Sequence, residues 1–422
     1  MATERQREIE ATAGAILQTA EMKKAMEDAR QLLLTLPWAN SQTAQQTLQE
    51  VVDECAGYAL LSAASTDYEN PGIVWLQTPP KQWLGHSVTG SRFCFDNPDN
   101  IYRYVFIDDE STYVLDSRPT GPTGRFSVAI YVALTGAEVE SWADWERTVD
   151  AADEGRMIMD SAGASRITIG PEAPQDGSLH LKSKGGVFMI IREALSDWHT
   201  QRPRSMSFRR VAGPEPRVLT FEDRVAIAVR YMKFGAQTIA QFEPLHASIP
   251  VNGFGAALMR GHATKPSMIT QGRYHLADGE ALVVTFLPQG AEYMSFSVTS
   301  PWLISRNAHS KAGSRTAHQS HQNADGTYTY VVTPRDPGVA NWMDTDGLRE
   351  GCLAMRWEGM HSPVVDTDDA IKSVKLVKLS ALRSELPTDF PSVGPAERSA
   401  ELAGRRLDYG SRCGVDCTFA GD

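Results

Sequence analysis

Hydrophobic positions in the first 66 residues recur three and four apart, the spacing of one helix face. The pattern predicts one helix that stops at Pro37 and a second that begins near Ser41. The residues that carry it are Ile9, Ala13, Ile16, Leu17, Met22, Met26 and Leu32–Leu34 in the first helix, and Leu48, Val51, Val52, Cys55 and Leu60 in the second. We expect a helical segment that covers a sheet or mediates a dimer.

After Asn70-Pro71-Gly72 the pattern changes to short β-branched and aromatic runs separated by turn residues. The predicted strands are residues 101–107, 111–117, 125–134, 186–193, 281–288, 292–299, 327–333, 352–359 and 372–379. Asp108–Glu110, between the first two runs, predicts a hairpin turn. One further helix is predicted over residues 219–242, with Thr220 as its N-cap and Asp223 three residues later.

Strands that do not alternate regularly with helices are typical of antiparallel sandwiches and jelly rolls. The predicted fold class is therefore α+β and mainly β, with antiparallel jelly-roll or sandwich-like modules, an N-terminal helical segment and a helical connector. The predicted boundaries are 1–66 for the helical segment, 67–215 for the first β-module, 216–262 for the connector, 263–382 for a C-terminal jelly-roll-like domain and 383–422 for a tail.

Composition narrows the possible partners. The formal charge of −11 disfavours nucleic acid, and no window has the roughly 20 apolar residues of a membrane span. The N-terminal stretch lacks the apolar core of a signal peptide, so we expect a cytoplasmic protein whose five cysteines are reduced thiols. Cys413 and Cys417 have three residues between them, which does not fit a zinc knuckle.

Four segments together carry a family resemblance. They are "NPDNIYRYVFIDDESTYVLDSR" (97–118), "DGEALVVTFLPQGAEYMSFSVTSPW" (278–302), "DPGVANWMDTDGLREGCLAMRW" (336–357) and "LPTDFPSVGPAERSAELAGRR" (386–406). The chain thereby resembles bacterial proteins that carry the domain of unknown function 1214, over roughly residues 70–406. The resemblance implies a jelly-roll-like C-terminal domain in a protein of catabolism or secondary metabolism, and it implies no particular reaction. Such proteins commonly have His after the glycine of the closing loop, where this chain has Leu348 after Gly347.

The stretch "RDPGVANWMDTDGLREG" (335–351) concentrates charged side chains between two apolar runs. Asp344 and Asp346 are candidates for acid and base, because paired carboxyls can divide these roles when their surroundings separate their pKa values. Arg349 is the candidate electrostatic clamp. The competing interpretation is structural: DPG forms a turn, Trp342 fills the core and an arginine holds a carboxylate. An EF-hand is excluded, because Leu353 stands where its bidentate Glu would be.

Histidines supply the candidate proton relay. His309, His318 and His321 lie in one polar stretch, and His275 follows Tyr274 at the start of the C-terminal domain. We predict His318 or His275 as the relay and the Tyr274 hydroxyl as a donor to a developing negative charge. Solvated loop histidines and edge packing are the alternatives. A divalent metal at the clustered histidines is also possible, although H-E-x-x-H is absent.

Other motifs argue against organic cofactors. No P-loop, G-x-S-x-G elbow or G-x-G-x-x-G is present. "DTDD" (366–369) spells the D-x-D-D string of terpene cyclases, but that motif belongs to a helical barrel. The main hypothesis is a cofactor-independent enzyme of hydrolase, lyase or isomerase type that acts on a small, largely apolar metabolite between β-modules. A non-catalytic ligand-binding or assembly protein, and a terpene-cyclase-like or metal-dependent enzyme, are the alternatives. A homo-oligomer is possible.

Overall fold

The computed structural model describes residues 3–132, 148–260, 265–361 and 370–419. Its N-terminal part is helical: α1 spans Glu4–Leu17, α2 Ala20–Leu34 and α3 Gln42–Ser65, with a short 3-10 turn at Pro37–Asn40. The side chains of Thr3, Thr19 and Ser41 each accept a backbone N–H in the first turn of the helix they precede. The first predicted helix is thus two helices, because Thr19 caps a new start well before Pro37.

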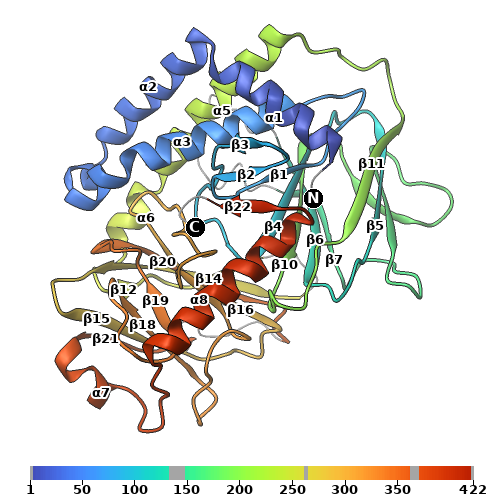
Figure 1. Ribbon diagram of the computed structural model, residues 1–422. Helices are drawn as coiled ribbons and strands as arrows, with labels where there is room; N and C mark the ends of the chain where they lie inside the picture. The colour runs from blue at the N-terminus through green and yellow to red at the C-terminus, as the bar shows by residue number, and fades with distance from the viewer. Residues whose placement is uncertain (1–2, 133–147, 261–264, 362–369, 420–422) are drawn as a thin grey trace.

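A fourth helix, α5 (Phe221–Gln241), packs with these three and is followed by the short α6 (Glu243–Ser248). Thr220 and Asp223 form the predicted capping box at its start. The group of α1, α2, α3 and α5 lies at the top of Figure 1. From Val51 onward α3 is buried on nearly all sides, because helices surround it and a sheet lies beneath.

The first β-module is a sandwich of two sheets. One sheet has the strand order β1-β4-β10-β6-β7 and the other β11-β5-β8-β9. The strands are β1 Val74–Leu76, β4 Asn100–Phe106, β5 Thr112–Arg118, β6 Arg125–Val132, β7 Thr148–Asp153, β8 Ser165–Gly170, β9 Leu179–Lys182, β10 Gly186–Ala194 and β11 Ser205–Ala212. All pairings are antiparallel except that of β8 with β9.

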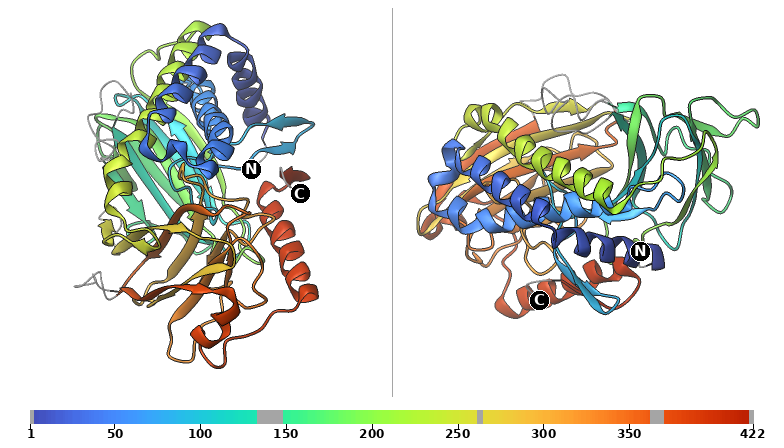
Figure 2. Two further views of the ribbon diagram at one scale, coloured as in Figure 1. Left: turned by 90° about the vertical axis from the view of Figure 1, so that its left-hand side faces the viewer. Right: turned by 90° about the horizontal axis from the view of Figure 1, so that it is seen from above.

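Every residue of β4 is buried, because its sheet is covered on both faces. Val105 faces the interior of the sandwich, whereas Tyr104 and Phe106 belong to the core shared with the helices. Helices, first sheet and second sheet therefore form three layers (Figure 2). The helical segment covers the sheet, which is one of its two predicted roles.

The predicted hairpin at Asp108–Glu110 is wrong. β4 and β5 belong to different sheets of the sandwich and do not pair. The connection is an arch that crosses from one sheet to the other. Asp108 builds it by accepting hydrogen bonds from the backbone of Ser111 and from the Tyr113 hydroxyl. A turn-rich spacer therefore fixed the reversal of the chain but not the strand partner.

The C-terminal module is a second sandwich. One sheet runs β12-β14-β20-β16-β17, with β13 also paired to β14, and the other runs β19-β18-β15-β21. The strands are β12 Gly253–Phe254, β13 Leu258–Arg260, β14 Ser267–His275, β15 Glu280–Phe286, β16 Tyr293–Thr299, β17 Ser314–Thr316, β18 Tyr328–Thr333, β19 Trp342–Asp344, β20 Glu350–Glu358 and β21 Ile371–Lys378. Between the sheets lies a core that includes Phe286, Phe296 and Trp357. The fold class predicted from the sequence is confirmed.

The last residues run back over both modules. A 3-10 turn at Leu379–Ala381 and helix α7 (Leu382–Glu385) precede the long helix α8 (Pro395–Gly410) and a 3-10 turn at Ser411–Cys413. The final strand β22 (Cys417–Phe419) then joins β2 (Lys81–Trp83) and β3 (His86–Val88) in a small sheet. In Figure 1, α8 crosses from the C-terminal module toward the N-terminus. No helix among the described residues is long and apolar enough to cross a membrane.

Candidate active site

The first half of the 335–351 stretch is a structural turn. Asn341 has a φ of +49° and its side chain donates to the carbonyls of His321 and Thr329. The indole of Trp342 donates to the Thr333 carbonyl at 2.9 Å, while its ring lies under the Arg398 guanidinium. These contacts fix β19 beside β18, as the structural interpretation requires.

The second half holds the two candidate carboxyls in different surroundings. Asp344 ends β19 and is 5% exposed, and burial raises its pKa to about 6. One Asp344 oxygen accepts the backbone N–H of Asp346 at 2.8 Å. Asp346 has a φ of +55°, which turns its own side chain away from that bond. Two acids of one tight loop therefore meet different partners.

The Asp346 carboxylate belongs to a charged network. It accepts from Arg306 at 3.1 Å and from the Asn307 amide at 3.2 Å, and Lys311 is 3.9 Å away. Arg306 also contacts Glu50 of α3 at 2.7 Å. The C-terminal loop is thus bound to the helical layer through one arginine.

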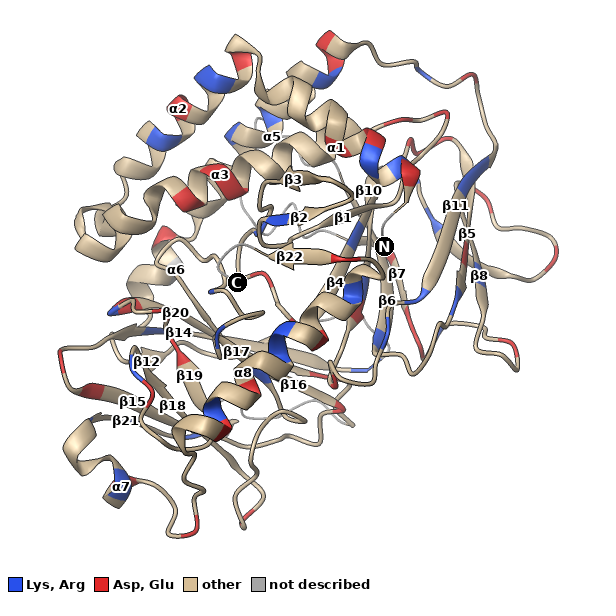
Figure 3. Ribbon diagram, viewed as in Figure 1, with Lys and Arg blue, Asp and Glu red and all other residues tan. Residues whose placement is uncertain are grey.

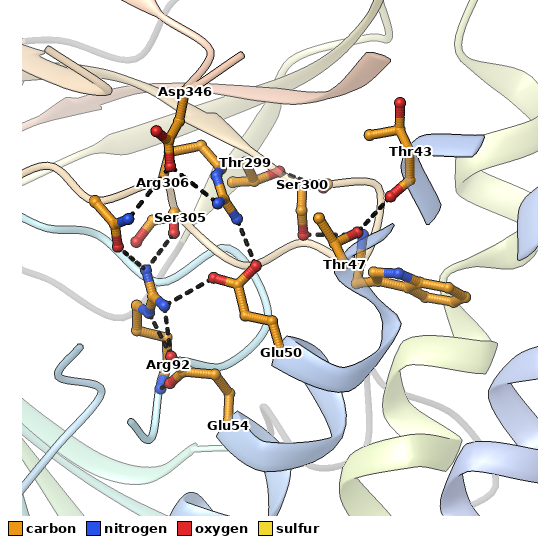
Figure 4. Close-up of polar contacts among 12 residues, drawn as sticks. Thr43, Thr47, Glu50, Glu54, Arg92, Thr299, Ser300, Ser305, Arg306 and Asp346 are labelled. Atoms are coloured by element: carbon orange, nitrogen blue, oxygen red, sulfur yellow. Dashed lines mark hydrogen bonds and ion pairs between the residues drawn. The ribbon is translucent and has the colours of Figure 1, made fainter. Parts of the chain in front are cut away.

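Arg92 extends the network into the first module (Figure 4). Its guanidinium lies 2.9 Å from Glu50 and 2.5 Å from Glu54, one helical turn further along α3. It also donates to the Ser305 carbonyl at 2.7 Å. Acids and arginines alternate along the chain of contacts, so each charge except those at the ends lies between two opposite ones.

Burial has opposite outcomes for the two glutamates. Burial acts to raise the pKa of Glu50, but the charges of Arg92 and Arg306 outweigh it and hold that pKa below its ordinary value. Burial prevails at Glu54 and raises its pKa, although Arg92 lies beside it. The Glu50 and Asp346 side chains are 25% and 19% exposed, so solvent reaches one edge of the network.

Tyr274 supplies a buried hydroxyl near this loop. The residue is 2% exposed, and among the described residues its hydroxyl has no hydrogen-bond partner. Burial raises the pKa of Tyr274, and the charges of Arg306, Glu350 and Asp344 all act on it. Arg306 Nε and Glu350 Oε1 are likewise buried without a partner in the described part of the chain. Such unmet buried groups are uncommon and are where a ligand or water is expected.

The other predicted site residues face solvent. The Arg349 side chain is 55% exposed and pairs with Asp278, which is 69% exposed. His275 is 65% exposed beside Glu350, and His318 is 61% exposed, 3.6 Å from Asp197. Neither imidazole lies in an enclosed site with Asp344, so the predicted proton relay is not assembled.

The three clustered histidines diverge. His309 is buried against the rings of Tyr409 and Phe419, and His321 lies edge-on to Phe390. Within residues 3–132, 148–260, 265–361 and 370–419, no group of three or more His, Cys, Asp or Glu side chains is arranged to hold a metal ion. Asp366, Asp368 and Asp369 of the D-x-D-D string lie outside the described residues.

Sequence reasoning missed Glu50, Glu54, Arg92 and Arg306. Glu50 and Glu54 are four residues apart next to apolar positions of the second predicted helix, which was the available signal. Arg92 and Arg306 gave none, because their partners are 38 to 256 residues away in the chain.

Comparisons with known proteins bear on the fold. No family model matches the chain, and neither does any curated protein. An uncharacterized protein from Burkholderia cenocepacia has a similar structure, with a TM-score of 0.68 and 19% identity over 87% of this chain and 99% of that chain. A protein from Vibrio parahaemolyticus matches at a TM-score of 0.39 and 14% identity, over 67% of this chain and 90% of that one. The first likeness shows a shared fold across most of both chains.

Proposed function

We propose that the chain is a cofactor-independent enzyme that transfers protons on a small, largely apolar metabolite, in a reaction of hydrolase, lyase or isomerase type. The observation that carries the proposal is Asp344. Its carboxyl is almost fully buried, and its pKa of about 6 lets it take up and release a proton near neutral pH.

The neighbouring groups suit that chemistry. Asp344 takes a proton from the substrate, and the Tyr274 hydroxyl donates a hydrogen bond to the negative charge that develops. Arg306 adds positive charge on the same side and stays placed through Glu50 and Asp346. The exposed edge of Glu50 and Asp346 is the entrance that we assign to the substrate. Arg349, His275 and His318 have no role in this scheme, because they lie in solvent.

Metabolite profiling of the full-length protein tests the proposal. Dialysed protein is incubated with a bacterial metabolite extract, without added nucleotide or metal, and the mixture is followed by mass spectrometry. We expect a metabolite to be consumed and a product of the same mass, or one that differs by the elements of water, to appear. Asp344→Asn abolishes the conversion, whereas the exposed Asp389→Asn keeps it. No conversion by the wild type, or equal conversion by Asp344→Asn, would refute it.

We retain the relation to proteins with the domain of unknown function 1214 as a proposal. In its support, the four resembling segments coincide with β4–β5, β15–β16, β19–β20 and α8. Within the proposal, the NPDN motif has a structural part: Asp99 accepts hydrogen bonds from Tyr293 of the C-terminal module and from Trp198. We also propose a cytoplasmic location, on the basis of free thiols at all five cysteines.

A further inference from the structure

A separate cleft opens at the edge of the first sandwich. It lies between the edge strands β1 and β11, beside the start of α1 and the turn that follows α8, and its volume is about 620 Å³. The ends of the described chain meet here, because Thr3 and Ser411 both line it. Figure 1 and Figure 2 both place the N-terminus beside the end of α8. None of its lining residues belongs to the candidate active site.

The cleft is basic in an acidic protein. Its lining includes five arginines and no acid or lysine; the arginines are Arg5, Arg103, Arg202, Arg204 and Arg412. Figure 3 marks basic segments of β4 and β11 on this side of the molecule. Arg5 pairs with Glu8 and Asp67, and Arg103 pairs with Glu193. Three acids thus face five arginines, which leaves positive charge at the cleft.

Two of the arginines have no carboxylate within ion-pair distance among the described residues. The Arg202 guanidinium donates to the backbone carbonyls of Trp198 and Gln201. Arg412 lies against the rings of Trp198 at 4.4 Å and Tyr409 at 4.1 Å, and Asp99 acts on it only at longer range. Both can therefore accept an external anion.

Arg412 is the unusual member. It is 2% exposed, and one terminal nitrogen donates to the Pro98 carbonyl at 2.5 Å. In the described part of the chain, its Nε and its other terminal nitrogen have no acceptor. Leaving guanidinium donors unmet away from water costs free energy, so an acceptor at the inner wall of the cleft would stabilise the fold. The aromatic rings hold the guanidinium plane in place for it.

The opposite wall is apolar. Ile73, Met206 and Phe208 line the cleft and also pack at the margin of the sandwich core. A ligand that fills both parts needs an anionic head and an apolar body. We propose that this cleft binds a small organic acid whose carboxylate meets Arg412 and Arg202 and whose hydrocarbon part lies on Ile73, Met206 and Phe208.

Titration calorimetry of the full-length protein with octanoate tests this site. We expect one saturable site, weakened at high salt, with octanol failing to compete because it lacks the charge. Arg202→Gln lowers the affinity about tenfold or more, since one charge-assisted hydrogen bond is lost. Arg209→Gln, on the same strand but paired with Asp116 outside the cleft, leaves it unchanged.

Further arms separate the alternatives. Arg412→Lys keeps the charge but loses the planar fork, so it also weakens octanoate binding. If that variant does not fold, Arg202→Gln carries the test. Absence of saturable octanoate binding, equal binding by Arg202→Gln, or binding of inorganic phosphate in place of octanoate would overturn the proposal. Asp344→Asn must not change octanoate affinity, which keeps this outcome separate from that of the proposed activity.

Discussion

Asp344 and Asp346 are two residues apart, but the fold gives them different chemistry. Asp344 ends a buried strand and loses water, whereas the left-handed backbone of Asp346 turns its carboxylate toward Arg306. The sequence predicted this pair as a candidate, because charged residues crowd a short stretch between apolar runs. It could not predict which acid is buried, since the arginine that holds Asp346 comes from a loop 40 residues away.

At the residue scale, the stability of Asp344→Asn should depend on pH. The pKa of Asp344 is raised from 3.8 to about 6 in the folded protein. The wild type therefore loses up to about 3 kcal/mol of folding free energy as pH rises from about 4 through 6, because a charge must stay buried. The variant avoids this loss and becomes relatively more stable with pH in urea unfolding. Asp389→Asn, an exposed control, should show no such trend; a difference that stays constant for Asp344→Asn would contradict the assignment.

Tyr274→Phe separates a functional hydroxyl from a structural one. The hydroxyl has no partner among the described residues, so its removal should leave the free energy of unfolding unchanged or raise it by about 1 kcal/mol. Metabolite conversion should fall. The matched control is Tyr330→Phe, also buried, whose hydroxyl donates to Ser320 at 3.2 Å and whose loss should cost about 1 kcal/mol. A large loss of stability in Tyr274→Phe would indicate a structural hydroxyl instead.

At the scale of elements, local signals were sufficient and strand partners were not. The α5 capping box could be predicted because both of its residues lie within one turn. The break between α1 and α2 was missed because the apolar spacing continues across it. The β4–β5 hairpin was wrong because pairing depends on sheets assembled from distant strands: β4 pairs with β10, more than 80 residues later.

Gly351 shows how one strand position shapes the site. An added Cβ would lie 2.2 Å from the Thr299 carbonyl and 2.7 Å from the Tyr274 hydroxyl. Gly351→Ala should therefore lower the free energy of unfolding by about 1–3 kcal/mol and move Tyr274. Gly404→Ala, in α8 with open space around it, should instead stabilise the protein by up to about 1 kcal/mol. Equal effects of the two substitutions in urea unfolding would contradict the close approach.

At the scale of the whole molecule, buried charges link the three parts. Arg92 of the first module joins Glu50 and Glu54 of the helical layer to Ser305 of the C-terminal module. Trp302 adds an apolar link, since its indole donates to the Ala44 carbonyl inside the helical core. These contacts join segments more than 200 residues apart, and nothing in the local pattern indicates them.

Arg92→Gln should therefore be far more damaging than its surface counterpart. It leaves Glu54 buried without its partner, and breaking a buried ion pair on one side costs about 3–5 kcal/mol. Arg349→Gln removes an exposed pair with Asp278 and should cost less than about 1 kcal/mol. Urea unfolding of both variants measures the contrast. Similar losses would mean that the network does not hold the modules together.

The pH profile of metabolite conversion tests the proposed chemistry most directly. If Asp344 is the base, the rate in the wild type should rise with pH and reach half of its plateau near pH 6, following the pKa of that carboxyl. Asp344→Asn should lose this rise together with the activity. A rate that is flat from about pH 5 to 8, or an Asp344→Asn variant with the wild-type profile, would contradict the assignment of Asp344 as the catalytic base.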